Sequence, residues 1–192
     1  MLKLYLFRHG ETDWNKENKM QSRADNLLNS KGLEQAKITA QILKDKNIEH
    51  IYSSPLKRAI QTADALKNIV NIDIEIIEDL AESDLSVFDG LNIDLFEERI
   101  KNGYYKKITG TDNFLEAMGC ESDEHIKKRI FNAILTICKK TPYKTIAISS
   151  HGNILKKLLI QCNFPDTSKL SNCEIIEAEF NDGKLEIIKR IK

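Results

Sequence analysis

Four short runs of apolar and β-branched residues recur along this chain, and helical patterns separate most of them. The runs cover residues 2–7, 48–53, 72–77 and 145–149. Strands that alternate with helices are typical of a mostly parallel sheet, because parallel neighbours need a crossover connection that a helix usually supplies. We therefore expect an α/β protein, a three-layer α/β/α fold with a mostly parallel central sheet.

Polar residues mark where the intervening helices should begin. Ser30 precedes apolar residues at helical spacing and is the candidate cap of the first long helix. Ser54 and Pro55 predict a second helix, since serine caps helices and proline suits the first helical position. A third helix should begin near Ser122, and a fourth should follow His151.

The end of the chain is typical of a β-hairpin. Two strand-like runs, residues 175–180 and 185–191, flank the sequence Asn181-Asp182-Gly183. Asp-Gly favours a tight turn because these residues accept the positive φ angles that such turns need. We expect this antiparallel hairpin at an edge of the sheet.

Residues 92–120 form the least regular stretch, in which a helix is expected only over residues 93–100. A chain of 192 residues suits one compact domain. We therefore interpret residues 1–192 as a single domain and residues 92–120 as a cap-like excursion from it.

Composition argues against several classes of protein. The 29 Lys and Arg residues balance 29 Asp and Glu residues, so no global field favours nucleic acid or anionic lipid. No apolar run approaches the roughly 20 residues that span a bilayer, and the first run leads into Arg8 without a signal-peptide cleavage site. The four cysteines form no Cys-x-x-Cys pair, which disfavours a zinc site. We expect a cytoplasmic protein that binds no metal, nucleic acid or membrane.

Cationic and imidazole side chains follow three of the expected strands. Arg8 and His9 follow the first strand, Arg58 follows the second, and His151 follows the fourth. The carboxyl ends of parallel strands meet at the edge where open α/β sheets hold ligands, and helix starts there favour anions. His9 alone could simply satisfy backbone groups, but the four side chains together predict an anion site.

The sequence Leu6-Phe7-Arg8-His9-Gly10-Glu11-Thr12, with Asn15 behind it, resembles the signature of the histidine phosphatase superfamily, the phosphoglycerate-mutase-like enzymes. The resemblance continues in family order over nearly the whole chain. Its further blocks are residues 21–32, 53–63, 80–90, 119–130 and 149–152.

This resemblance implies a phosphatase that forms a phosphohistidine on His9 and hydrolyses it, with Glu82 as general acid and then base. Arg8, Arg58 and a protonated His151 would surround the phosphoryl oxygens. The implied phosphate- and substrate-binding residues are Asn15, Gln21, Ser22 and Gly152. Such a ring of cations can stabilise phosphoryl transfer, so the resemblance implies no metal and no cofactor, and a small phosphorylated metabolite as substrate.

Two other functions stay open. A phosphoglycerate mutase would use the same site, and His151-Gly152-Asn153 fits that branch. Ser83-Asp84 after Glu82 and the lack of a long mutase-type insertion disfavour it. A catalytically silent member that binds a phosphorylated partner is expected to lack part of the catalytic set, and this chain retains it.

The substrate itself is less constrained. Sugar phosphates, phosphoserine, ribazole phosphate and phosphoglycerates are all candidates. We expect the 92–120 excursion to lie over the active site, where its basic and aromatic side chains either meet a second group of the substrate or form an exposed face. These side chains are Arg99, Lys101, Tyr104, Tyr105, Lys106 and Lys107. The apolar C-terminal hairpin leaves an edge that can pair in a homodimer.

Overall fold

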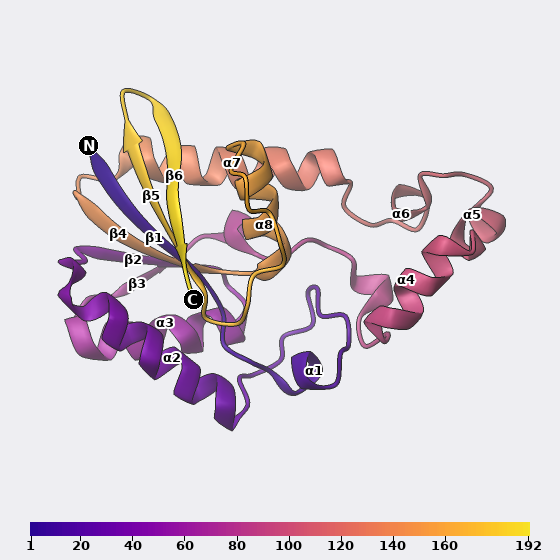
Figure 1. Cartoon of the computed structure of the whole chain (residues 1–192), viewed down its shortest axis with the longest axis horizontal. Coiled ribbons are helices and arrows are strands. Elements are labelled where there is room, and N and C mark those ends of the chain that lie inside the picture. The colour runs from indigo at the N-terminus through magenta and orange to yellow at the C-terminus, as the bar shows by residue number, and fades with distance from the viewer.

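A six-stranded sheet forms the centre of the molecule in the computed structural model, which describes residues 1–192 (Figure 1). Its strands are β1 (Leu2–Arg8), β2 (His50–Ser53), β3 (Ile74–Ile76), β4 (Thr145–Ser150), β5 (Ile175–Asn181) and β6 (Lys184–Ile191). Their order across the sheet is β3-β2-β4-β1-β5-β6. The strands β1 to β4 run parallel, whereas β5 pairs antiparallel with β1, and β6 with β5. The expected mostly parallel sheet with an antiparallel hairpin at its edge is confirmed.

Helices cover both faces of this sheet. Figure 1 shows α2 and α3 on one side and α7 and α8 on the other. These helices are α2 (Ser30–Leu43), α3 (Lys57–Val70), α7 (Asp123–Lys140) and α8 (Gly152–Gln161). Successive side chains of a strand point to opposite faces. In β1, Leu4 and Leu6 accordingly join the cluster under α7 and α8, while Tyr5 and Phe7 join the cluster under α2 and α3. The predicted three-layer fold is confirmed.

The remaining helical elements are short. They are α1 (Asp13–Lys16), α4 (Ile93–Lys101), α5 (Tyr104–Thr109), α6 (Phe114–Ala117) and the 3-10 turns η1 (Lys44–Lys46), η2 (Glu78–Leu80) and η3 (Ser86–Phe88). No helix combines the length and the apolarity that a membrane crossing needs.

Residues 92–120, here called the cap segment, form the lobe at the right of Figure 1 together with the turn before them. Phe88, Tyr105 and Cys120 make a small buried cluster there, and Phe96 and Phe114 pack on it. The expectation of a single helix is wrong, because the segment also contains α5 and α6. Both are too short, at 6 and 4 residues, to show a helical period in the sequence.

Two of the expected helix starts are also wrong in detail. Asn29 rather than Ser30 caps α2, and its Oδ1 accepts a hydrogen bond from the Gly32 amide at 2.8 Å. Asparagine and serine are about equally good caps, so their order in the sequence does not decide between them. Ser54 does not cap α3, because the helix begins later, at Lys57, with Leu56 in the cap position. The Ser54 hydroxyl accepts a hydrogen bond from the Leu56 amide at 3.3 Å and lies 2.6 Å from the His151 ring.

The expected starts of α7 and α8 and the expected hairpin turn are confirmed. The Ser122 hydroxyl caps α7, and α8 begins directly after His151. In the β5–β6 turn, Asp182 and Gly183 have φ angles of 49° and 79°. Two successive positive φ angles are the mark of a type I′ turn, which suits the twist of a hairpin.

Candidate active site

Three strand ends bring the predicted cationic and imidazole side chains together. Within the parallel strands, Arg8 of β1 lies opposite Ser150 of β4, so the residues that follow, His9 and His151, are neighbours. Their ring centroids lie 5.2 Å apart. Arg58, in the first turn of α3 after β2, reaches His9 with its Nε at 3.3 Å from His9 Nε2.

A cavity of about 840 Å³ lies at this edge of the sheet. The predicted site residues that line it are Arg8, His9, Asn15, Gln21, Ser22, Glu82 and Gly152. Arg58 and His151 do not line it, and neither has any exposed surface. The structure therefore gathers all of the predicted residues in one place, but two of them, Arg58 and His151, are buried and do not line the cavity.

The His9 ring has one hydrogen-bond partner on each nitrogen. Its Nδ1 lies 2.7 Å from the carbonyl oxygen of Gly10, which can only accept, so Nδ1 carries the proton. Its Nε2 faces the donor Nε of Arg58 and must accept. Burial lowers the pKa of His9 well below 6.5, and the charges of Arg8 and Arg58 act in the same direction. At pH 7 His9 is a neutral imidazole with its lone pair on Nε2.

Arg58 makes three hydrogen bonds within the protein. Besides the bond to His9, Nη1 donates to the Ala24 carbonyl at 2.7 Å and Nη2 donates to the Ser22 carbonyl at 2.8 Å. Burial lowers the pKa of Arg58 to about 10, although the charge of Glu82 opposes the shift. Arg58 is thus a cation at pH 7 that holds His9 and the backbone of residues 22–24.

His151 is also fully buried, with its Nε2 at 2.6 Å from the Ser54 hydroxyl. Burial lowers the pKa of His151 well below 6.5, and the charge of Arg58 lowers it further. In the protein by itself, His151 is therefore neutral at pH 7. The protonated His151 expected from the sequence requires the negative charge of a bound phosphoryl group beside it.

Three buried nitrogen atoms of the site have no hydrogen-bond partner in the protein. They are Arg8 Nε, Gln21 Nε2 and His151 Nδ1. Each side chain is otherwise anchored: Arg8 Nη1 donates to the Leu170 carbonyl at 2.7 Å, and Gln21 Oε1 accepts from the Thr12 hydroxyl at 2.7 Å. Buried polar groups in folded proteins are nearly always paired. The two that belong to residues lining the cavity, Arg8 Nε and Gln21 Nε2, are donors, so they indicate a ligand with acceptor oxygens.

Gly152 allows Arg8 to pack against the start of α8. A Cβ atom at Gly152 would lie 3.1 Å from Arg8 Nε, closer than an ordinary contact. A larger residue would therefore push the guanidinium group away from its position at the cavity.

The Glu82 carboxylate lies beside the first turn of α8. Its Oε1 accepts hydrogen bonds from the backbone amide of Ser83 at 2.8 Å and the hydroxyl of Ser83 at 3.2 Å. Its Oε2 accepts one from the backbone amide of Asn153 at 3.2 Å. The carboxylate is buried, with 7% of the residue exposed, and lines the same cavity as His9.

Two supporting residues were not predicted from the sequence. The Thr62 hydroxyl accepts a hydrogen bond from the Gly10 amide at 3.0 Å and so holds the backbone after His9. Asn172 donates to the His9 carbonyl at 3.1 Å and to Asn15 Oδ1 at 3.2 Å. Thr62 lies within the family-like block 53–63, but Asn172 lies in a loop with no pattern that could have identified it.

Two outer walls of the cavity differ in character. Helix α4 of the cap segment contributes Ile93, Phe96, Glu97 and Ile100. The other wall carries three basic residues, Lys156, Lys157 and Lys169. Of these, Lys157 forms an ion pair with Asp123. The cavity thus combines an apolar wall that carries one carboxylate with a basic wall.

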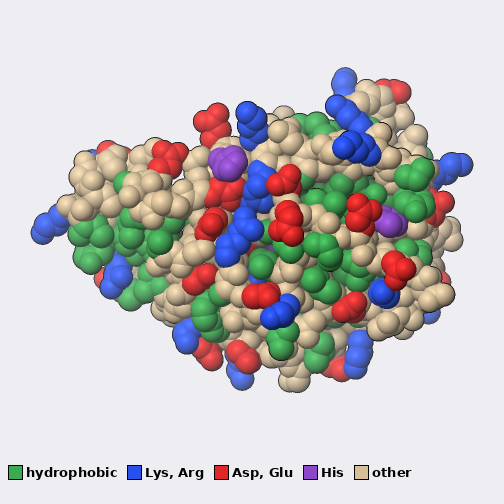
Figure 2. All heavy atoms as spheres, turned by 180° about the vertical axis from the view of Figure 1, so that it is seen from behind, with side chains coloured by type: hydrophobic (Ala, Val, Ile, Leu, Met, Phe, Trp, Pro, Cys, Tyr) green, Lys and Arg blue, Asp and Glu red, His purple; other side chains and the backbone are tan.

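The basic and aromatic residues that the sequence singled out in the cap segment do not line the cavity. Tyr105 is buried in the cap cluster, Arg99 packs over the Tyr104 ring, and Lys106 pairs with Asp112. Figure 2 shows hydrophobic side chains gathered on the cap at the left of the view. The exposed apolar side chains of α4 and α5 are Leu95, Ile100, Tyr104 and Ile108.

Known proteins resemble this chain over its whole length. The family model of the histidine phosphatase superfamily (branch 1) matches residues 4–191. An uncharacterized phosphatase, PhoE, of Bacillus subtilis is 31% identical over 97% of this chain and 93% of its own. A probable phosphoglycerate mutase, GpmB, of Escherichia coli is 32% identical over 95% of this chain and 87% of its own. The structure of phosphoserine phosphatase from Entamoeba histolytica in complex with 3-phosphoglyceric acid is 31% identical, with a TM-score of 0.80 over 100% of this chain and 98% of its own. The chain therefore belongs to the histidine phosphatase superfamily.

Proposed function

We propose that this chain is a metal-independent phosphomonoesterase that works through a phosphohistidine on His9. The observation that carries the proposal is the state of His9, a neutral imidazole with its lone pair on Nε2 at a cavity lined by the unpaired donors Arg8 Nε and Gln21 Nε2. Such an imidazole is a competent nucleophile, and its phosphorylated form is labile enough to be hydrolysed in a second step.

In the first step, His9 Nε2 attacks phosphorus and the bond from phosphorus to the leaving oxygen breaks. Glu82, as a carboxylic acid, donates its proton to that oxygen. In the second step, water attacks phosphorus, gives its proton to Glu82, and the nitrogen–phosphorus bond breaks. Inorganic phosphate leaves, and both His9 and Glu82 return to their starting states.

The unpaired nitrogen atoms Arg8 Nε, Gln21 Nε2 and His151 Nδ1 are the groups we assign to the phosphoryl oxygens, together with Asn15 at the cavity wall. A phosphate dianion beside His151 raises its proton affinity, so binding converts it into a donor. Arg8 and Arg58 add positive charge close to His9. Phosphoryl transfer depends mainly on positioning and charge stabilisation, and these cations supply the charge that a divalent ion supplies in other enzymes.

For the substrate, we propose a small phosphorylated acid. Lys156 and Lys169 line the cavity and take part in no ion pair, so they are free to meet a carboxylate. Glu97 on the α4 wall is suited to an ammonium group. Phosphoserine carries both groups, and the name of the Entamoeba histolytica relative makes it the first compound to test.

The mutase activity suggested by the Escherichia coli relative is the second candidate. A mutase must keep water away from its phosphohistidine long enough to return the phosphoryl group. Helix α4, which forms one wall of the cavity, buries none of its residues. A wall that is this open to solvent favours transfer to water.

The test is a panel of phosphomonoesters assayed for released phosphate in EDTA, beside an assay for 3-phosphoglycerate isomerisation with and without 2,3-bisphosphoglycerate. We expect phosphate release from phosphorylated acids, insensitive to the chelator. Brisk isomerisation without phosphate release would establish the mutase instead. Acid-labile phosphate trapped on the wild type and retained by His9→Ala would exclude His9 as the nucleophile.

A separate experiment tests whether Lys156 and Lys169 bind the carboxylate of the substrate. Lys156→Ala combined with Lys169→Ala should raise KM for phosphoserine while leaving KM for a neutral alkyl phosphate nearly unchanged. Equal effects on both compounds would rule out a carboxylate at this wall.

A further inference from the structure

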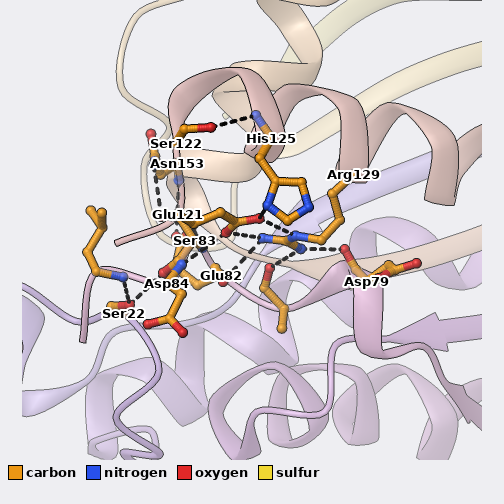
Figure 3. Close-up of polar contacts among 12 residues, drawn as sticks. Ser22, Asp79, Glu82, Ser83, Asp84, Glu121, Ser122, His125, Arg129 and Asn153 are labelled. Atoms are coloured by element: carbon orange, nitrogen blue, oxygen red, sulfur yellow. Dashed lines mark hydrogen bonds and ion pairs between the residues drawn. The ribbon is translucent and has the colours of Figure 1, made fainter. Parts of the chain in front are cut away.

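Arg129 and Glu121 form a forked ion pair outside the cavity (Figure 3). Arg129 Nε donates to Glu121 Oε1 at 2.7 Å, and Arg129 Nη2 donates to Glu121 Oε2 at 2.9 Å. Their side chains are 10% and 6% exposed. Two parallel charge-assisted bonds fix the orientation of a guanidinium group as well as its place.

Arg129 uses its other donors on the loop that carries Glu82. Its Nη1 donates to the carbonyl oxygens of Asp79 at 2.7 Å and Ala81 at 2.9 Å, and its Nη2 reaches the Glu82 carbonyl at 3.4 Å. All five N–H groups of the guanidinium therefore have partners, two on Glu121 and three on this loop.

Glu121 holds the same loop further along. Its Oε2 accepts a hydrogen bond from the Asp84 amide at 3.0 Å, and its own amide donates to the Asp84 carbonyl at 2.8 Å. On the opposite side, the Ser22 hydroxyl bonds to the Ser83 carbonyl and accepts from the Leu85 amide at 2.7 Å. Figure 3 shows Glu82 and Ser83 between these two anchors.

The loop has no regular secondary structure to hold its shape. Residues 82–85 belong to no helix or strand, so no ladder of backbone bonds fixes the direction in which Glu82 points. The guanidinium of Arg129 pairs with the backbone carbonyls of the buried residues Ala81 and Glu82. The Arg129–Glu121 pair thus holds the backbone from which the Glu82 carboxylate reaches the amides of Ser83 and Asn153 at the cavity.

We propose that Arg129 and Glu121 are positioning residues that hold the Glu82 carboxyl where it can protonate the leaving oxygen. The proposal rests on the phosphatase function proposed above. It also gives the cap segment a link to the chemistry, because Glu121 directly follows that segment and contacts the loop through both its backbone and its side chain.

The two steps of the reaction allow this role to be separated from a structural one. An alkoxide leaves only if an acid protonates it, whereas p-nitrophenolate leaves without a proton. The value of kcat/KM reports the phosphorylation step for both kinds of substrate. A misplaced Glu82 should therefore harm the alkyl substrate much more than p-nitrophenyl phosphate.

The experiment compares kcat/KM for p-nitrophenyl phosphate with that for the best alkyl phosphomonoester of the panel, in the wild type, Arg129→Lys and Glu121→Gln. Lysine keeps the charge but cannot fork. We expect a loss of roughly 10- to 100-fold with the alkyl substrate and less than about 3-fold with p-nitrophenyl phosphate, a part of what general acid catalysis contributes. Glu121→Gln keeps the backbone bonds and one acceptor oxygen, so it tests the proposal even if Arg129→Lys does not fold.

Two controls frame the result. Glu82→Gln should show the largest difference between the substrates, since it removes the acid itself. Arg190→Lys disturbs another buried pair, in which Arg190 Nε donates to Glu174 Oε1 at 2.6 Å, without touching residues 79–84. It should lower the unfolding temperature and affect both substrates to the same degree.

Equal losses on both substrates in Arg129→Lys and Glu121→Gln, with a clear difference in Glu82→Gln, would overturn the positioning role and leave the phosphatase intact. Wild-type protein that releases no phosphate from either substrate would instead overturn the proposed function.

Discussion

The Nε group of Arg58 donates a hydrogen bond to Nε2 of His9 across 3.3 Å, so a buried cation touches the atom that we propose as the nucleophile. This contact orients the imidazole ring and opposes its protonation. The bond is long, and an attacking nitrogen must give it up when it bonds to phosphorus. Arg58 can therefore hold His9 ready without blocking its reaction.

The variant Arg58→Lys should show how much the bonds made by the Arg58 guanidinium contribute to the rate of the reaction. Lysine keeps the charge, but one nitrogen cannot donate in three directions to His9, Ser22 and Ala24 as the guanidinium does. We expect kcat to fall roughly 100-fold, in line with the loss of one preorganised donor elsewhere. Steady-state kinetics measure this, with Lys57→Ala on the exposed side of the same helix turn as the control. A change within about 3-fold would contradict the assigned role.

The buried histidines predict a dependence of stability on pH. His9 and His151 have pKa values well below 6.5 in the folded protein, whereas the unfolded chain binds protons at these rings near pH 6.5. The unfolded state is therefore favoured as the pH falls through this range, and the free energy of unfolding should drop by up to about 1.4 kcal/mol per pH unit for each ring. Urea unfolding at pH 7.5 and pH 5.5 measures the difference.

The control for this prediction is a pair of variants. His151→Gln removes one of the buried rings and should reduce the pH dependence more than His50→Gln, which removes a partly exposed ring at the far end of β2. An unchanged slope in His151→Gln would show that its ring does not stay neutral on folding.

Because the Gln21 side-chain amide has an unpaired nitrogen, we expect its isosteric replacement by glutamate to weaken the binding of phosphate. Gln21→Glu keeps an oxygen for the bonds from Thr12 and Asn26 but puts a second, charged oxygen where Nε2 is buried without a partner. We expect the inhibition constant of inorganic phosphate to rise at least about 10-fold, since a donor is lost and a repulsive charge is added. Gln35→Glu makes the same exchange away from the cavity. An equal rise of the inhibition constant in this variant would contradict a specific contact between Gln21 and phosphate.

We expect the substitution Gly32→Ala to destabilise the protein, although glycine-to-alanine changes in helices usually stabilise. Replacing glycine by alanine inside a helix normally stabilises a protein by roughly 0.5–1 kcal/mol. At Gly32 a Cβ atom would lie 2.1 Å from the Glu11 carbonyl oxygen, because the start of α2 packs directly on the backbone after His9. Gly32→Ala should therefore destabilise by about 1–3 kcal/mol. Ser30→Ala, an exposed change in the same turn, should stay within about 0.5 kcal/mol in the same thermal unfolding assay.

The sequence predicts which side chains gather at one edge of the sheet, because the ends of strands can be recognised in a sequence. A short apolar run followed by Arg8-His9 or by His151 places these side chains at one edge once the strands are parallel, and the register of β1 with β4 made them neighbours. The finer roles were not readable. Arg58 does not line the cavity, because its Nη atoms bind the carbonyls of Ser22 and Ala24, and these come from a loop without periodicity. The neutral state of His151 depends on its complete burial, which no local pattern encodes.

The cap segment shows the same limit at the level of the fold. Helix α4 has enough residues to show its apolar spacing, but α5 and α6 are ordered by mutual packing of Phe96, Tyr105 and Phe114. Contacts of that kind arise between elements rather than within one. The residues of this segment that line the cavity could therefore be identified only from the structure.

The cluster of Phe88, Tyr105 and Cys120 shares no residue with the two clusters that hold the sheet and its helices together. Mutations that reshape the wall formed by α4 can thus accumulate without loosening the core that orients His9 and Arg58. Under the proposed function, changes in the cap can therefore alter which substrates bind without disturbing the residues proposed for the chemistry. Transplanting the cap between relatives is accordingly a natural route to new specificities.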